Sequence, residues 1–244
     1  MLTIFLNTMI LRLLQRNQAV RERPNRWLAT VCFGCGAERR SSVANLCGGC
    51  LEDVEASIRL EPVFGAGDFV PYPYQGTVAH LIRRAKFGPS LAAAWTLGEL
   101  LANAITDDAC TVDWVVPVPL HWRRELGRGF NQAAAIAIVV ARRLNASFAP
   151  GRLTRPRATA PQSNLSPLER RRNVNGAFEW RGSQTPGSIV LIDDVVTTGA
   201  TARSVKRCLR AAGVTDVRMW AVAAVDAGPL RTTQSKRSRA DPLA

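Results

Sequence analysis

The feature that most constrains the fold lies near the carboxyl end of the chain. Two continuous apolar runs, SIVLID (188–193) and VRMWAVAAV (217–225), flank a segment with helical spacing, TARSVKRCLRAAG (201–213). That segment ends at Gly213, a typical helix stop, and its apolar face holds Ala202, Val205, Cys208, Leu209 and Ala212. Strand, helix and strand in so short a stretch form a βαβ unit with parallel strands. Because the runs do not alternate with polar residues, we expect both faces of the sheet to be covered, as in an α/β fold.

The first of these strands runs into an acidic pair and a loop of small residues, in the string VLIDDVVTTGAT (190–201). The loop leads into a predicted helix, whose N-terminus offers unpaired N–H groups and a partial positive charge to a phosphate. Thr197, Thr198 and Thr201 can donate hydroxyls, and Gly199 lets the backbone approach a ligand closely. Open α/β sheets bind ligands at this end of their strands.

The adjacent carboxylates of Asp193 and Asp194 set this loop apart from other phosphate loops. Neither a Walker motif (Gly-x4-Gly-Lys-Thr) nor a dinucleotide fingerprint is present in the string. Carboxylates suit the vicinal hydroxyls of a ribose, or a metal ion held with them. The alternative is that the two aspartates only cap the following helix. The complete twelve-residue string favours ligand binding.

Five further elements are expected upstream of this unit. Aromatic residues within 64–74 indicate a strand, apolar spacing indicates helices at 77–87, 91–105 and 128–144, and WVV (114–116) is a strand that Pro117 and Pro119 lead out of the sheet. Residues 152–176 are polar, rich in arginine and interrupted by prolines, with a short helical piece at 167–174. A loop of that length in a compact domain is usually functional or disordered.

Four of the six cysteines form a metal-binding pattern. Two CxxC pairs are separated by eleven residues, and they comprise Cys32, Cys35, Cys47 and Cys50. Four thiolates in two such pairs are typical of a closed structural zinc site. The alternatives are a redox dithiol, which usually has a single CxxC, and buried free thiols. Cys110 and Cys208 have apolar neighbours and are interpreted as small core residues.

The two ends of the chain lack a globular pattern. Residues 1–26 begin with an apolar stretch that Asn7, Thr8 and Arg12 interrupt, and no small-residue cleavage site follows. No stretch reaches the roughly 20 apolar residues of a membrane span, so we expect a cytoplasmic protein with a poorly determined leader. Residues 227–244 have no apolar periodicity and are expected to be disordered.

Charge is unevenly distributed along the chain. The net charge is +13, and 29 of the 32 basic residues are arginine. Between Pro117 and Arg181 twelve arginines face three acids, so this part should attract an anion.

The string 190–201 resembles the 5-phosphoribosyl-1-pyrophosphate (PRPP) motif of type I phosphoribosyltransferases. Four other segments, in order, resemble the ComF family of phosphoribosyltransferase-like proteins, which is linked to DNA uptake in natural transformation: CFGC…CGGC, YPYQGTVAHLIRRAKFG, VVPVPLHWRRELGRGFNQ and RATAPQSNLSPLERRRNVNGAF. The likeness covers about residues 30 to 226. It implies a phosphoribosyltransferase domain at 60–226, with a central mostly parallel sheet flanked by helices, preceded by a four-cysteine zinc module at 27–56.

The resemblance also implies roles for individual residues. Asp193 and Asp194 would bind the ribose hydroxyls as catalytic residues, with Mg²⁺ bridging ribose and pyrophosphate. The 5′-phosphate would lie in a cradle made of Val195, Val196, Thr197, Thr198, Gly199, Ala200 and Thr201. Pyrophosphate would be bound by arginines of the two middle segments, for which the candidates are Arg123, Arg124, Arg128, Arg171 and Arg172; a solvated, arginine-rich turn is the alternative.

Two functions remain open at this point. The first is a PRPP-binding protein that transfers a phosphoribosyl group to an unknown acceptor. The second is a non-catalytic accessory of competence that binds single-stranded DNA, works with the uptake machinery at the inner membrane and keeps the PRPP loop as a sensor or scaffold. No lysine lies between Lys86 and Lys206 to stabilise a leaving pyrophosphate, and no segment specifies a nucleobase, which weakens the case for catalysis. RRAKFG (83–88) has the composition of a single-strand contact, but we favour the interpretation that its cations end a helix.

Overall fold

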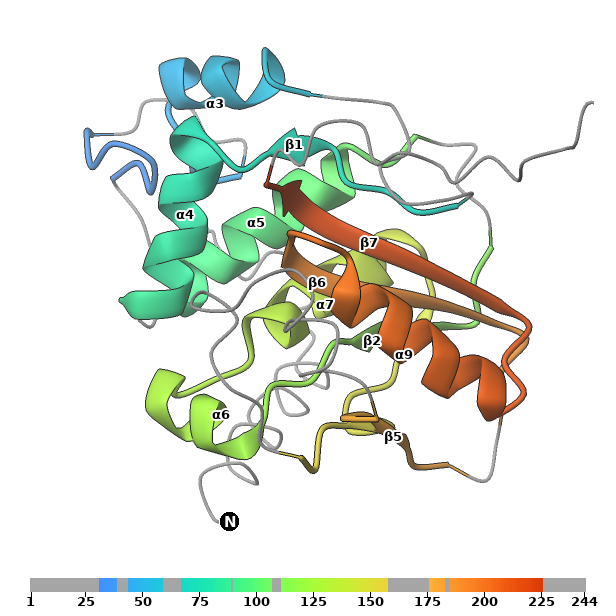
Figure 1. The fold of residues 1–244 in the computed structure, drawn as a ribbon. Coiled ribbons are helices and arrows are strands. Elements are labelled where there is room, and N and C mark those ends of the chain that lie inside the picture. Colours follow the sequence, from blue (N-terminus) through green and yellow to red (C-terminus); the bar gives the residue numbers. More distant parts are fainter. Residues whose placement is uncertain are drawn as a thin grey trace, which may run out of the picture.

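The centre of the molecule is a five-stranded parallel sheet (Figure 1). The computed structural model describes residues 31–38, 44–58, 67–88, 90–106, 111–157, 176–182 and 185–225. The strands lie in the order β1-β7-β6-β2-β3, and every neighbouring pair is parallel. Their bounds are Tyr72–Pro73 (β1), Trp114–Pro117 (β2), Ser147–Phe148 (β3), Ser188–Val196 (β6) and Asp216–Ala224 (β7). The expected α/β architecture is confirmed.

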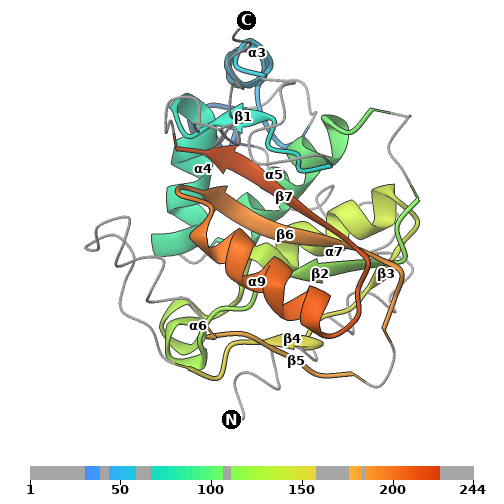
Figure 2. The same ribbon diagram turned by 45° about the vertical axis from the view of Figure 1, so that its right-hand side comes forward.

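Helices cover both faces of this sheet, which explains why its strands are apolar throughout (Figure 2). Successive side chains of a strand point to opposite faces. Val190 and Ile192 of β6 pack with α5 (Leu91–Asn103) and α7 (Gln132–Arg143), whereas Ile189 and Leu191 pack with α9 (Ala200–Ala211). One strand thus holds two hydrophobic clusters together.

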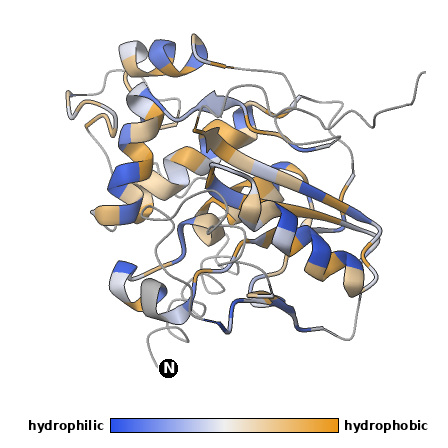
Figure 3. Ribbon diagram, in the orientation of Figure 1, coloured by the Kyte–Doolittle hydropathy of each residue, from blue (hydrophilic) through white to orange (hydrophobic). Residues whose placement is uncertain are grey.

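The helices follow the apolar spacing of the sequence closely. α4 (Gly76–Phe87) buries Val78, Leu81, Ile82 and Ala85, the residues that predicted it. α5 and α7 also lie where the pattern placed them, and α9 carries its hydrophilic and hydrophobic residues on different faces (Figure 3). Amphipathic spacing thus located α4 and α9, whereas continuous apolar composition located α5 and α7, which are buried along most of their length.

Several local expectations were wrong or incomplete. β6 does not end at the acids, because Val195 and Val196 continue the ladder opposite Ala223 and Ala224 of β7. Between β2 and α7, where no separate helix was predicted, the chain forms α6 (Trp122–Arg128). A two-stranded antiparallel sheet of β4 (Leu153–Thr154) and β5 (Glu179–Trp180) was not expected.

The cysteine segment packs against α4 rather than standing apart. Its helix α3 (Gly48–Glu55) carries Asp53, whose Oδ2 accepts the Thr77 N–H at 3.0 Å and so caps the N-terminus of α4. Nearer the other end of α4, Arg84 donates to the Phe33 carbonyl at 3.0 Å. Two polar contacts therefore dock the cysteine segment onto the helix.

Some sequence predictions fall outside the described residues. The leader (1–26), the tail (227–244) and the arginine-rich segment from 158 to 175 are among them. Within the described ranges, no helix has the length and apolar character needed to cross a membrane.

Candidate functional site

A cavity of about 500 Å³ opens at the carboxyl ends of β2 and β6. After β2 the chain crosses through α7 to β3, whereas after β6 it crosses through α9 to β7 on the other side. The two connections leave in opposite directions, which makes this the topological switch point where open α/β sheets bind ligands. Residues at the ends of both strands line the cavity: Val118, Pro119 and Leu120 follow β2, Asp193 to Val196 end β6, and Thr197 and Gly199 to Ala202 follow β6.

The two acids lie side by side in the cavity but in different environments. Asp194 is 8% exposed, and its Oδ2 lies 3.1 Å from Nζ of Lys86, at the carboxyl end of α4. Asp193 Oδ1 accepts the backbone N–H of Asp194 at 2.9 Å. The ammonium of Lys86 therefore lies beside Asp194, whereas Asp193 accepts a hydrogen bond from its neighbour's backbone. The two acids have different nearest partners although both line the cavity.

Electrostatics separate the two acids further. Burial is the main cause that raises the pKa of Asp193, and the neighbouring Asp194 carboxylate raises it further. Lys86, the Asp194 N–H and Arg155 lower it, and the resulting pKa is about 7. A carboxyl group with such a pKa exchanges its proton near neutral pH. Asp193 is thus the acid whose charge changes with small changes of pH.

Most residues of the predicted phosphate cradle line the cavity. Thr197, Gly199 and Thr201 line the cavity, and Gly199 has φ +67°, a left-handed conformation that favours glycine. Gly199, the N-cap residue of α9, has no side chain that could cap the helix, and Ala200 and Thr201 of the first turn line the cavity. Val195, Val196 and Ala200 also line the cavity, whereas Thr198 does not; its carbonyl accepts Arg203 Nη2 at 2.8 Å.

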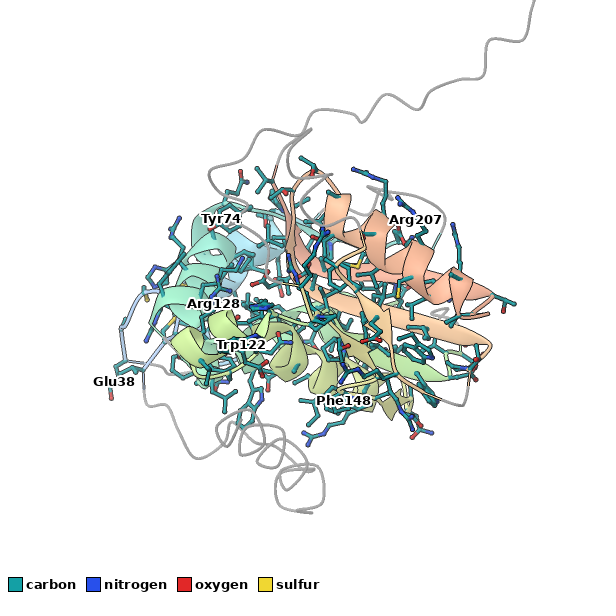
Figure 4. All side chains as sticks on the ribbon, turned by 60° about the horizontal axis from the view of Figure 1, so that its bottom comes forward. Glu38, Tyr74, Trp122, Arg128, Phe148 and Arg207 are labelled. Carbon is teal, nitrogen blue, oxygen red and sulfur yellow. The ribbon has the colours of Figure 1, made fainter. Side chains whose placement is uncertain are left out.

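Of the five arginines predicted to bind pyrophosphate, Arg128 lines the cavity. Nη1 of Arg128 donates to Oε1 of Gln132 at 3.3 Å. In Figure 4, Arg128 lies on the same side of the molecule as Tyr74 and Trp122, away from Arg207 of α9. Arg123 and Arg124 belong to α6, but their side chains lie outside the described part of the structure, as do Arg171 and Arg172 altogether. Their predicted role stays a prediction.

Two cations of the cavity were not assigned to it from the sequence. Lys86 was interpreted as a helix-ending residue; it does lie in the last turn of α4, and it also pairs with Asp194. Arg155 is 7% exposed, lines the cavity and lies over the Phe178 ring at 5.3 Å from its centroid. No local pattern distinguishes Arg155 from the other arginines of its segment. For Lys86, the available signal was the string RRAKFG, in which cations stand beside an aromatic residue.

The four cysteines converge as their spacing predicted. The sulfurs of Cys32, Cys35, Cys47 and Cys50 all lie within 4.8 Å of one another, and Cys35 Sγ is 3.7 Å from Cys47 Sγ. A tetrahedral zinc ion with Zn–S bonds of about 2.3 Å needs sulfurs about 3.8 Å apart. The four cysteines are therefore positioned to bind a metal ion.

Backbone groups around the sulfurs favour metal binding as well. Cys32 Sγ accepts the N–H groups of Gly34 at 3.3 Å and Cys47 at 3.2 Å. Burial alone would raise the pKa of the Cys32 thiol, but the backbone N–H groups of Cys35, Cys47 and Gly34 outweigh it and lower that pKa to about 6. The thiolate, the form that binds metal, is thus stabilised before any ion arrives.

The acid pair is a poorer match to a divalent cation. Carboxylate oxygens are the ligands that Mg²⁺ prefers, but Oδ2 of Asp194 is engaged by Lys86 and Oδ1 of Asp193 by a backbone N–H. Among the described residues, the cysteine cluster is the one group of three or more metal-ligating side chains. As folded, Asp193 and Asp194 do not form a Mg²⁺ site by themselves.

Comparisons with known proteins identify relatives over most of the chain. It is 30% identical over 200 residues to Competence protein F of Haemophilus influenzae, covering 79% of this chain and 83% of that protein. It is 32% identical over 207 residues to DNA utilization protein YhgH of Escherichia coli K12, covering 83% and 87% of the two chains. Competence protein ComFC of Streptococcus pneumoniae is 34% identical over 107 residues, 44% of this chain and 46% of that protein.

Solved structures give a weaker likeness. Orotate phosphoribosyltransferase from Aeropyrum pernix matches with a TM-score of 0.36 at 20% identity, over 58% of this chain and 64% of that one. Adenine phosphoribosyltransferase from Thermoanaerobacter pseudethanolicus matches with a TM-score of 0.35 at 15% identity, over 71% and 87%. No family model matches the chain. On the strength of the sequence relatives, the chain belongs to the ComF family, that of Competence protein F and DNA utilization protein YhgH.

Proposed function

We propose that the cavity at the switch point binds PRPP. The observation that carries this proposal is the combination, in one cavity of about 500 Å³, of two carboxylates and the N-terminus of a twelve-residue helix. A phosphoribosyl ligand needs both groups, since its hydroxyls pair with carboxylates and its phosphate with backbone N–H groups.

Each part of the ligand has a partner in the cavity. The ribose hydroxyls bind Asp193 and Asp194, and the 5′-phosphate binds Thr197, Gly199 and the first turn of α9. The pyrophosphate faces the cations Lys86, Arg128 and Arg155, which all line the same cavity. Mg²⁺ bound with PRPP would supply further positive charge to the pyrophosphate. The arginines predicted from the sequence, Arg123, Arg124, Arg171 and Arg172, join these cations in the proposal.

The relatives suggest the process in which this site works. They are named for competence and for DNA utilization. We therefore place the PRPP-binding chain in DNA uptake or use, with the uptake machinery as its partner. Transfer of the phosphoribosyl group would break the bond between ribose C1 and the pyrophosphate oxygen and form one from C1 to the acceptor. Release of free pyrophosphate from PRPP in the presence of an acceptor is the measurement that separates transfer from binding.

Isothermal calorimetry with PRPP tests the proposal directly. We expect binding by the intact chain and a loss of about tenfold or more in affinity in Asp193→Asn and in Asp194→Asn, because each removes a charged hydrogen-bond acceptor. Asp216→Asn is the matched control, since Asp216 pairs with Arg218 at the start of β7, away from the cavity. Absence of heat with the intact, folded chain would refute the proposal.

A second candidate, binding of single-stranded DNA, is favoured by one observation. Phe87 lines the cavity yet is 76% exposed, next to Lys86. An exposed aromatic ring beside a cation is the arrangement on which unpaired bases stack. Fluorescence anisotropy with a labelled oligonucleotide should show binding that weakens steeply with salt and weakens again in Phe87→Ala. Equal affinity of Phe87→Ala and the parent chain would remove this candidate.

A further inference from the structure

Lys86 is held in the cavity by the fold around it. The carbonyl of the preceding residue, Ala85, accepts Nε2 of Gln132 at 3.0 Å, and Gln132 is only 1% exposed. Gln132 is itself the first residue of α7, whose N-cap residue Asn131 donates through Nδ2 to the Val118 carbonyl at 3.1 Å, just after β2. The end of α4 is therefore fastened to the end of β2, and Lys86 is directed at the neighbouring strand β6.

A helix-capping role does not account for this placement. A lysine in the last turn gains by lying near the helix's own terminal carbonyls. The ammonium of Lys86 instead lies 3.1 Å from Asp194 Oδ2, and the two side chains are only 21% and 11% exposed. Removing two charges from water to this extent is costly unless they pair, so each of them depends on the other.

The described residues that line the cavity carry charges of both signs. Three of them are cations, Lys86, Arg128 and Arg155, and two are acids, Asp193 and Asp194. Lys86 and Arg155 both favour the ionised form of Asp193, and Lys86 also contacts Asp194. An anionic ligand entering this cavity meets a small net positive charge rather than two uncompensated carboxylates.

We propose that Lys86 is the resident cation of the acid pair, so that this chain binds its phosphoribosyl ligand without requiring Mg²⁺. The ammonium neutralises Asp194 and adds positive charge beside the pyrophosphate, which are the two contributions a divalent cation would make. This inference rests on the proposed PRPP binding. It assigns to Lys86 a positioning role that neither its sequence context nor the acid pair reveals.

Calorimetry of the full chain with PRPP, in EDTA and in excess Mg²⁺, tests this inference. For the parent chain we expect affinities within about threefold of each other in the two buffers. Lys86→Gln should lose about tenfold or more in EDTA and regain most of it in Mg²⁺, whereas Lys86→Arg, which keeps the charge, should resemble the parent chain. Circular dichroism checks that each variant is folded.

A titration with Mg²⁺ alone gives a readout that does not involve PRPP. Lys86→Gln should bind Mg²⁺ more tightly than the parent chain does, because the vacated carboxylate becomes available to it. PRPP binding by the parent chain that disappears in EDTA would overturn the inference while leaving the proposed function intact. No PRPP binding in either buffer would instead reject the proposed function. Equal PRPP affinities of Lys86→Gln and the parent chain in EDTA would also overturn the role of Lys86. If Lys86→Gln fails to fold, the PRPP affinities of the parent chain in EDTA and in Mg²⁺ still test whether binding requires Mg²⁺.

Discussion

The metal centre can be tested through a glycine that leaves no room for a side chain. A Cβ built on Gly34 would lie 2.7 Å from Cys50 Sγ, 3.0 Å from Cys50 Cβ and 3.1 Å from Thr77 Cγ2. Contacts between carbon atoms are optimal at about 3.5–4.0 Å, so Gly34→Ala must push the Cys50 sulfur away by several tenths of an ångström or more. A metal site tolerates deviations of only about 0.2 Å in its bond lengths.

The expected cost follows from this crowding. Inserting a methyl group into a filled space costs about 1–3 kcal/mol, which corresponds to a roughly 5- to 150-fold weaker affinity for zinc. Because Thr77 also belongs to the N-terminus of α4, the same methyl group should loosen the contact between the cysteine segment and that helix. Gly34→Ala should therefore lower both zinc affinity and the melting temperature.

Competition with a chromogenic zinc chelator measures the affinity, and a thermal melt with and without chelator measures the stability. Gly49→Ala is the matched control, because Gly49 lies in α3 beside the same cysteines and a Cβ there meets nothing within 4 Å. We expect Gly49→Ala to keep its zinc and its melting temperature. The reasoning would be refuted if Gly34→Ala held zinc as tightly as Gly49→Ala does.

The remaining predictions concern three acids, Asp193, Asp68 and Asp216. The pKa of Asp193 is raised from 3.8 to about 7 in the folded chain. Between these pH values the folded chain holds a proton on Asp193 that the unfolded chain releases. The free energy of unfolding should therefore fall as pH rises from about 4 to 7. Asp193→Asn should accordingly raise the melting temperature at pH 8 by roughly 2–4 °C per kcal/mol gained, with little change at pH 4. An equal rise in melting temperature at pH 4 and pH 8 would show that the raised pKa of Asp193 is not the cause. Asp68, which is 6% exposed, accepts both Lys206 Nζ and the Met219 N–H, so Asp68→Ala should cost about 3–5 kcal/mol in urea unfolding. Asp216→Ala breaks the more exposed pair with Arg218 and should cost about 1 kcal/mol or less. If Asp68→Ala and Asp216→Ala lost similar free energies of unfolding, burial would not explain the importance of Asp68.

The parts of the fold that the sequence predicts are those that local spacing determines. α4 buries the residues whose spacing predicted it, and α9 buries Ala202, Val205 and Leu209 of its predicted apolar face. α5 and α7 are buried along most of their length, and β6 and β7 are apolar because both of their faces are covered. α6 escaped prediction because its large apolar residues, Trp122 and Leu126, are 46% and 41% exposed and therefore leave no amphipathic pattern of burial. The end of β6 was misplaced because its length depends on the partner strand β7, which supplies pairs up to Ala224.

The candidate site divides in the same way. The acids, the phosphate loop and the cysteines are contiguous or regularly spaced, so their chemistry is visible in the sequence alone. Lys86 and Arg155 belong to the cavity only because the end of α4 and the end of β4 bring them close to the acids of β6. Arg155 is distinguished from its neighbouring arginines by its burial over Phe178, which is a tertiary contact with no local sequence signal.

The different environments of the two acids give them different effects on stability. The ammonium of Lys86 lies 3.1 Å from Oδ2 of Asp194. Burial and the neighbouring Asp194 carboxylate raise the pKa of Asp193, so the fold works against its ionised form. Replacing Asp194 by asparagine would leave the ammonium of Lys86 without its carboxylate, whereas replacing Asp193 would remove a charge that the fold disfavours. The two adjacent aspartates should therefore change stability in opposite directions at pH 8, although the loss of either weakens the same binding site.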